Sequence, residues 1–307
     1  MSGTLRGGVI GAGVFGGYHA AQYARLPGVD FVGVYDIHPD RAARVAMPLG
    51  GRAFADFAEL LGEVDVVTVA SPASHHAEQA LEALAAGRHV YVEKPVATRL
   101  TDAEKVRAAA ARAGRIVACG HQERVVFQAM GLLDIPEPPL LLEALRHGPP
   151  SDRSRDVSAV LDLMVHDIDL VLAIAAAEPA AAEAEGARGD DGVWDVARAE
   201  ASFENGFTAI LDVSRRAEAR RRTMRIVYPS GEVEIDFVAR TFRNTTPHAL
   251  NADFAETPAA RDPLGASIEG FLGAVRGEAP RPVVTVGEAI AALDLALAVE
   301  QALENAG

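Results

Sequence analysis

The sequence predicts an α/β fold followed by an α+β fold. Residues 1–120 are expected to form a parallel, doubly wound sheet, and residues 121–307 an open, mostly antiparallel sheet with helices. Three observations support this division. The chain has 307 residues, of which 49% are hydrophobic. A chain of this length usually forms two domains, each with its own hydrophobic core. Apolar runs alternate with helical stretches up to residue 120, and hairpin signals dominate after it.

In the first 120 residues, short β-branched runs end at turn residues and are followed by stretches with helical character. An alanine-rich stretch ends at Gly87, which is suited to a helix C-cap. Strands separated by helices imply parallel pairing. We expect strands at 7–13, 29–36, 64–72, 89–95 and 115–121, and helices at 14–26, 38–50, 75–87 and 101–114.

After residue 120 the pattern changes to strands joined by short turns. The tripeptides ENG and PSG are typical of hairpins. The alanine-rich residues 174–190 favour a helix by propensity, with a strand near 180–187 as the alternative. We expect strands at 140–148, 195–206, 207–217, 221–231 and 232–242, and helices at 161–174, 264–276 and 286–304.

Composition narrows the classes of partner and compartment. The net charge of −14 argues against nucleic acid as a partner, since nucleic-acid binders are usually basic. No stretch approaches the roughly 18 apolar residues of a membrane span, and the N-terminus lacks a long apolar segment typical of a signal peptide. Cys119 has no partner for a disulfide, so we expect a soluble, cytoplasmic protein. The arginine-rich residues 215–225 indicate either a solvated or subunit-facing strand, or an anion contact.

A glycine-rich turn follows the first expected strand and opens the first expected helix. It reads Gly11-Ala12-Gly13-Val14-Phe15-Gly16, the G-x-G-x-x-G pattern in the context that a Rossmann dinucleotide site requires. The glycines permit a tight turn and close approach of a pyrophosphate to the helix N-terminus. Asp36 ends the second strand at a spacing suited to the adenosine ribose hydroxyls, which favours NAD over NADP, although Arg41 lies nearby.

The segment LDLMVHDIDL, residues 161–170, places acids and a histidine within an apolar helix. At helical spacing Asp162, His166 and Asp169 share one face, and Asp167 points elsewhere. Three interpretations are open: a metal site, an acid/base cluster, or a core helix that carries acids. Zinc and iron sites usually draw a ligand from a second element as well, and several histidines or acids of this chain could supply one.

At residues 91–97 the chain reads YVEKPVA, and Glu93-Lys94-Pro95 after a strand of a Rossmann domain resembles the Gfo/Idh/MocA oxidoreductases. Three further segments resemble that family in order and spacing. They are SPASHH with Ser71, Pro72 and His76, CGHQER with Gln122, and the Asp162-x-x-x-His166 helix. The pattern is most similar to the short members of the UDP-N-acetylglucosamine 3-dehydrogenase type. RVVFQ departs from their usual R-F-N-P near the substrate pocket.

The resemblance implies an NAD(P)-dependent dehydrogenase of a sugar, polyol or nucleotide sugar, with no metal. Lys94 is the first candidate for the base that accepts the hydroxyl proton, and a cis Lys94-Pro95 bond is expected. His166 is the second candidate, and Asp162 would hold its tautomer or bond a substrate hydroxyl. Arg124 pairs either with a substrate anion or with an internal acid.

The cofactor-binding residues implied are the glycine-turn residues and a second set at the strand ends: Asp36, Ser71, Pro72, His76, Glu93, Lys94 and Gln122. Arg153 and Arg155 either reach a diphosphate or lie in a solvated loop. Two alternatives to a dehydrogenase remain open. They are a cofactor-binding sensor without turnover and an NAD-dependent enzyme that cleaves glycosides. The open sheet predicts a homodimer or homotetramer.

Overall fold

The computed structural model describes residues 3–150 and 157–306, so Arg153 and Arg155 lie outside the described residues. The chain divides into two compact units. Unit 1 comprises residues 1–122 and 262–290, and unit 2 comprises residues 123–261 and 291–307. No helix among the described residues has the length and apolar character needed to cross a bilayer.

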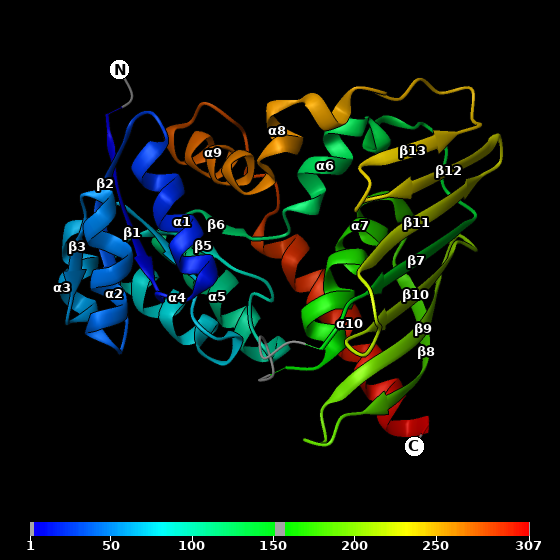
Figure 1. The fold of residues 1–307 in the computed structure, drawn as a ribbon, viewed down its shortest axis with the longest axis horizontal. Helices are drawn as coiled ribbons and strands as arrows, with labels where there is room; N and C mark the ends of the chain where they lie inside the picture. The colour runs from blue at the N-terminus through cyan, green and yellow to red at the C-terminus, as the bar shows by residue number, and fades with distance from the viewer. Residues whose placement is uncertain (1–2, 151–156, 307) are drawn as a thin grey trace. The chain divides into compact units, whose positions relative to one another are not determined.

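Unit 1 is built on a six-stranded sheet in the order β3-β2-β1-β4-β5-β6, and all its pairs are parallel. Helices lie on the sheet in Figure 1, which confirms the predicted doubly wound domain. Its strands are β1 (Leu5–Ile10), β2 (Val29–Tyr35), β3 (Arg52–Phe54), β4 (Val66–Val69), β5 (His89–Val92) and β6 (Val117–Cys119). Its first helices are α1 (Val14–Arg25), α2 (Pro39–Ala46), α3 (Phe57–Glu63), α4 (His76–Ala85) and α5 (Leu100–Ala113).

The central strand β4 is buried at every residue, as expected for a parallel strand with helices on both faces. The sequence pattern did not predict β3 and α3, because a three-residue strand carries no periodicity. The Asp56 carboxylate begins α3 by accepting hydrogen bonds from the backbone N–H groups of Ala58 and Glu59. This cap was the available sequence signal.

Helix α9 (Pro263–Arg276) belongs to unit 1, although it follows most of unit 2 in the chain. The hydroxyls of Tyr91 on β5 and Ser267 on α9 lie 2.9 Å apart. The Tyr91 ring also packs edge-on against Phe271, and three α9 side chains join the core of unit 1: Ile268, Phe271 and Leu272. The predicted division at residue 120 places α9 in the second domain instead. Sequence order alone does not reveal that the chain comes back to pack on the first sheet.

Unit 2 is built on a seven-stranded sheet in the order β13-β12-β11-β7-β10-β9-β8. Among the described strand pairs of this sheet only β7–β10 is parallel, which confirms the predicted mostly antiparallel sheet. The strands are β7 (Leu141–His147), β8 (Pro179–Arg188), β9 (Trp194–Phe203), β10 (Thr208–Ser214), β11 (Arg221–Tyr228), β12 (Gly231–Asp236) and β13 (Thr241–Asn244).

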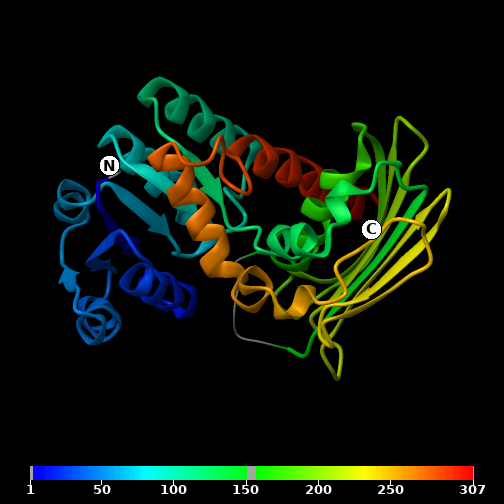
Figure 2. The same cartoon turned by 90° about the horizontal axis from the view of Figure 1, so that it is seen from above.

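Helices α7 (Val165–Ala175) and α10 (Val286–Ala306) lie on one face of this sheet, and no described helix covers its other face (Figures 1 and 2). Burial accordingly alternates along β7. The other helices of unit 2 are α6 (Glu123–Met130) and α8 (Pro258–Arg261). Short turns of 3-10 helix occur at 47–49, 73–75, 132–134 and 254–256.

Strand β8 resolves the ambiguity of the alanine-rich residues 174–190. It pairs with β9 in antiparallel register, with Ala182 opposite Ala201 and Ala184 opposite Ala199. The helix favoured by propensity is therefore wrong for residues 179–188, and the alternative strand is correct. Pairing with a neighbouring strand outweighs the small helix preference of alanine.

The start of α9 gives a test of how firmly this helix is held. The Asp262 carboxylate accepts from the Gly265 backbone N–H at 3.0 Å and from the Gln22 amide at 2.9 Å. We expect Asp262→Ala to lower the free energy of unfolding by about 1–2 kcal/mol in chemical denaturation. Asp253→Ala is the matched control, since Asp253 precedes a helical turn without a side-chain cap. An equal effect of both substitutions would contradict the capping role.

Candidate active site

The glycine turn after β1 leaves room where a dinucleotide requires it. A Cβ on Gly11, whose φ is +97°, would lie 2.7 Å from the Ala70 carbonyl oxygen. A Cβ on Gly16 would lie 1.8 Å from the Gly11 carbonyl oxygen. These two glycines therefore allow the turn and the close approach of α1 to β1. A Cβ on Gly13 would meet no described atom within 4 Å, so its open side is available to a ligand.

Asp36 is tied to this turn. Its Oδ2 accepts from the Ala12 backbone N–H at 2.7 Å and its Oδ1 from the His38 backbone N–H at 2.8 Å. The carboxylate is thereby oriented at the end of β2. A cavity of about 290 Å³ adjoins the turn and is lined by Ala12, Gly13, Val14, Arg41, Arg44 and Val45. Two of these side chains, Arg41 and Arg44, are cationic.

Glu93, at the end of β5, is a buried carboxylate with two side-chain partners. The Nε2 atom of His19 lies 2.6 Å from Glu93 Oε1, and the Gln122 amide donates to the same oxygen at 3.2 Å. Burial raises the pKa of Glu93, but the hydrogen bond to His19 and the charges of His19 and Lys94 outweigh it and lower that pKa. The sequence pattern did not reveal His19, since no local motif connects it to a strand end 74 residues later.

Lys94 follows directly and is half-buried, and the Lys94-Pro95 bond is cis, as predicted. The His76 ring connects two loops, with Nδ1 2.7 Å from the Pro95 carbonyl oxygen and Nε2 2.8 Å from the Ser71 carbonyl oxygen. Burial lowers the pKa of His76. His76 therefore braces the backbone beside Lys94. Within unit 1 the structure brings together Ser71, Pro72, His76, Glu93, Lys94 and Gln122.

In unit 2, Asp162 lies within a π-helical turn at residues 160–164, and His166 and Asp169 lie on α7, which follows this turn directly. Each side chain has its own partner. The observed pairs are Asp162 with Arg215 at 3.1 Å, His166 with Glu123 at 2.8 Å and Asp169 with Arg124 at 2.7 Å.

One of these pairs bears on an alternative left by the sequence. Arg124 is buried and its guanidinium donates to both Asp169 carboxylate oxygens, so an internal acid is one of its partners. Asp167, which was not expected to share in the cluster, is also buried. It accepts two hydrogen bonds from Arg146, at 2.8 and 2.9 Å. No three metal-ligating side chains form a group within residues 3–150 and 157–306.

Arg146 on β7 is the most buried cation among the described residues of unit 2, with 2% of its side chain exposed. Besides Asp167, it donates from Nη1 to Glu123 Oε1 at 2.9 Å. Glu123 also contacts His166, so Arg146 and His166 share one carboxylate. Sequence reasoning missed Glu123, although it lies within the segment CGHQER that was singled out.

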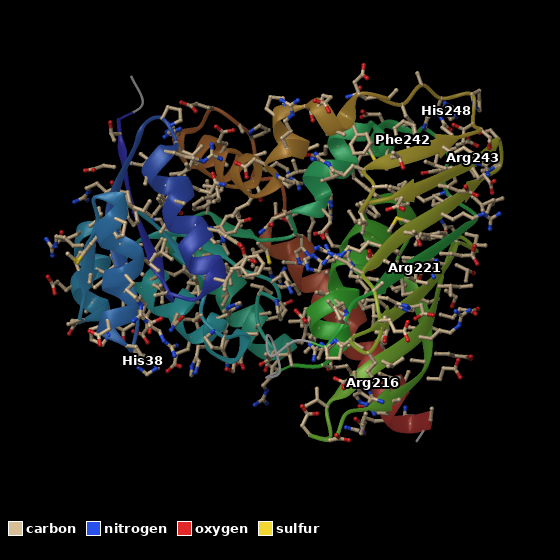
Figure 3. All side chains as sticks on the ribbon, in the orientation of Figure 1. His38, Arg216, Arg221, Phe242, Arg243 and His248 are labelled. Atoms are coloured by element: carbon tan, nitrogen blue, oxygen red, sulfur yellow. The ribbon has the colours of Figure 1, made fainter. Side chains whose placement is uncertain are left out.

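The arginine-rich residues 215–225 divide between the two faces of a strand. Arg215 pairs with Asp162, and Arg222 lies 3.8 Å from Glu123, so these two belong to the histidine side. Arg225 pairs with Glu143 and Glu232 on the opposite face, and Arg221 is exposed. Figure 3 labels Arg216 and Arg221 on this stretch. Successive side chains of β11 point to opposite faces of the sheet, so Arg222 and Arg225 lie on different faces.

The glycine turn generates a prediction that separates folding from cofactor binding. Gly13→Ala meets nothing in the described protein, and the φ of −73° suits alanine, so stability should be unchanged. Dinucleotide affinity, measured by calorimetry, should fall by about tenfold or more, roughly 1.4 kcal/mol. Gly62→Ala is the matched control because its Cβ would also have open space, on α3. Unchanged affinity in Gly13→Ala would remove the turn from the binding site.

The buried cation generates a second prediction. Arg146→Met leaves Glu123 and Asp167 without their main partner, so the free energy of unfolding should fall by about 3–5 kcal/mol in urea denaturation. Arg225→Met is the control. Arg225 also contacts two carboxylates, but solvent screens it, and we expect a loss of about 0–1 kcal/mol. Similar losses in both variants would contradict a special role of burial.

Comparison with known proteins gives the family. Residues 5–121 match the model of the oxidoreductase family with an NAD-binding Rossmann fold, and residues 143–234 match the GFO/IDH/MocA C-terminal domain. The chain is 36% identical to UDP-N-acetylglucosamine 3-dehydrogenase of Acidithiobacillus ferrooxidans, over 98% of this chain and 99% of that protein. The solved structure of that enzyme superposes with a TM-score of 0.90 at 34% identity, over 98% of both chains.

Two other relatives share less. Inositol 2-dehydrogenase 3 of Saccharopolyspora erythraea is 35% identical over 54% of this chain and 52% of that protein. The WlbA dehydrogenase of Bordetella pertussis, solved with NADH and UDP-GlcNAcA, has a TM-score of 0.90 at 18% identity over 100% of this chain and 97% of that one, a likeness of fold alone. Full-length identity, both domain models and the observed folds together place the chain in the GFO/IDH/MocA family of NAD-binding oxidoreductases, as an oxidoreductase that acts on CH–OH groups.

Proposed function

We propose that the protein is an NAD-dependent dehydrogenase of a nucleotide sugar of the UDP-N-acetylhexosamine class, which oxidises a secondary ring hydroxyl to a ketone or runs the reverse. One observation carries the proposal. The identity to UDP-N-acetylglucosamine 3-dehydrogenase extends through both units, whereas that to the inositol dehydrogenase covers about half of the chain. Because substrate contacts in this proposal come largely from unit 2, identity there has the greater weight.

The cofactor is proposed to be NAD. The open side of Gly13 fits a pyrophosphate, and the oriented Asp36 carboxylate suits ribose hydroxyls and repels a 2′-phosphate. Arg41 and Arg44 beside the turn are the features that favour NADP. When bound, the nicotinamide supplies the acceptor for the hydride.

Lys94 and His166 are the two proposed candidates for the base that accepts the hydroxyl proton. Lys94 stands on a braced strand end beside the buried Glu93, and His166 has one ring nitrogen on Glu123. Asp162 lies next to Arg215 and is 16% exposed, which suits a hydrogen bond to a substrate hydroxyl. Lys94, Arg124, Asp162 and His166 are the proposed substrate-binding set, and Asp169 orients Arg124 by accepting hydrogen bonds from its guanidinium.

The open face of the unit 2 sheet supports a homodimer or homotetramer. Half-buried apolar side chains, among them Leu141, Leu145 and Ile210, lie on this face between ion pairs. A cavity of about 620 Å³ on this sheet includes Leu145 and Ile210 in its lining. Sedimentation velocity tests the assembly. A cytoplasmic location is part of the proposal, supported by the single cysteine in the sequence.

The direct test mixes the purified protein with NAD or NADP and a panel of UDP-N-acetylhexosamines, free hexoses and inositols, and follows NADH absorbance. We expect turnover with NAD and a UDP-N-acetylhexosamine, with kcat/KM highest for that class. Turnover confined to inositols or free sugars would overturn the substrate class. Binding of NAD without turnover on any substrate would indicate a sensor, and release of a sugar without net NADH would indicate glycoside cleavage.

Lys94→Ala tests the lysine. We expect NAD affinity near that of the wild type and turnover lower by on the order of 100-fold or more, because a positioned proton-transfer group is lost. Lys105→Ala is the control, since Lys105 is an exposed lysine of α5 paired with Asp102. Wild-type turnover in Lys94→Ala would exclude Lys94 from the chemistry.

A further inference from the structure

Glu123 begins α6 and has the most concentrated set of cationic neighbours in the described part of unit 2. Its Oε2 lies 2.8 Å from Nδ1 of His166. Its Oε1 accepts from Arg146 at 2.9 Å and lies 3.8 Å from Nη1 of Arg222. The side chain is only 18% exposed, so little water competes with these contacts.

The carboxyl group of Glu123 is ionised at neutral pH. Burial raises its pKa, but the charges of His166 and Arg146 outweigh burial and hold that pKa well below its usual range. Among the described residues of this cluster, Glu123 and Asp167 supply two negative charges, and Arg146 and Arg222 supply two positive charges. The Glu123 carboxylate therefore stabilises a positive charge on the neighbouring imidazole.

We propose that Glu123 is a positioning residue that keeps the proton of neutral His166 on Nδ1, so that Nε2 is the atom that accepts the substrate hydroxyl proton. The proposal deepens the proposed function and rests on it. A carboxylate can only accept a hydrogen bond, and Glu123 Oε2 lies 2.8 Å from Nδ1, so a hydrogen bond between these two atoms would require N–H at Nδ1. The neutral imidazole then carries its lone pair on Nε2, the only ring atom that can take a proton.

The step balances in protons and electrons. A bound oxidised nicotinamide would accept the hydrogen of the carbinol carbon as hydride, with two electrons. The hydroxyl O–H bond breaks and its proton joins Nε2 of His166, and the C=O bond forms. His166 becomes an imidazolium whose Nδ1–H faces the Glu123 carboxylate, so the charge that forms in the step is met by a fixed anion.

Asp162, the partner expected from the sequence, has its carboxylate 3.1 Å from Arg215. Among the described residues, the charged groups near His166 come from several elements: Glu123 of α6, Arg146 of β7, Arg222 of β11, Asp167 of α7, and the Asp162–Arg215 pair before α7 and after β10. Of the carboxylates in this set, Glu123 is the one that lies 2.8 Å from the imidazole.

The tautomer is testable in the protein without substrate. Histidine ring ¹⁵N resonances of the wild type, assigned by loss of a signal in His166→Gln, report which nitrogen carries the proton. We expect neutral His166 to carry it on Nδ1. In Glu123→Gln the pKa of His166 should fall by about 1 pH unit or more, because an opposite charge is lost. A neutral His166 with its proton on Nε2, or an unshifted pKa in Glu123→Gln, would overturn the proposal.

The kinetic test determines whether the contact between Glu123 and His166 affects the proton transfer of the reaction. In Glu123→Gln, kcat should fall by on the order of 100-fold with KM changed less than about threefold. The acid limb of the kcat/KM profile should move to lower pH, since the base is then protonated only at lower pH. Glu123→Asp, which retains the charge, should restore the position of that limb.

Glu137→Gln is the matched control. Glu137 holds His248 at 2.6 Å, also as a carboxylate on an imidazole, and His248 lies in the loop after β13 (Figure 3). It should leave kcat and the pH profile unchanged. A fall in kcat for Glu123→Gln with an unmoved acid limb would mean a structural role only. If the wild type turns over no member of the panel, the proposed function fails, and the resonance experiment still decides the tautomer.

Discussion

The buried guanidinium of Arg146 constrains how the helices of unit 2 pack against its sheet. The cost of burying Arg146 is several kcal/mol unless carboxylates surround it, and its partners come from two helices. Glu123 begins α6 and Asp167 lies on α7, so the charge on β7 fixes both helices against the same strand. His166 is adjacent to one partner in sequence and in contact with the other. The position of the proposed base is therefore a consequence of where a buried positive charge finds its counterions.

In the proposed function, unit 1 brings backbone close to a pyrophosphate and presents a lysine at a strand end. The glycine turn leaves room for the first, and the Asp36 carboxylate supports this turn from the next strand. Hydrogen bonds to Glu93 and around His76 hold the segment that carries Lys94. The proposed residues of each unit are thus held by contacts within that unit.

The sequence predicted best where a requirement is local. The glycine turn, the Asp36 position and the cis Lys94-Pro95 bond follow from a few consecutive residues, and the two sheet types follow from the change in turn chemistry. Two features escaped prediction because they depend on distant partners: the imidazole of His19 and the carboxylate of Glu123 meet their partners only in the folded chain. For β8 the sequence offered a strand only as the alternative to a helix, and pairing with β9 decides between them.

The return of α9 to unit 1 has a consequence for how the protein comes into being. Tyr91 and its neighbours in the first sheet are covered by side chains from residues 263–276, near the other end of the chain. During synthesis, the ribosome produces all the strands of unit 2 before these residues emerge. The apolar surface of the nascent Rossmann sheet therefore stays exposed until α9 has been synthesised, and exposed apolar surface of this kind is what chaperones bind. The sheet of unit 2 can already fold during this time.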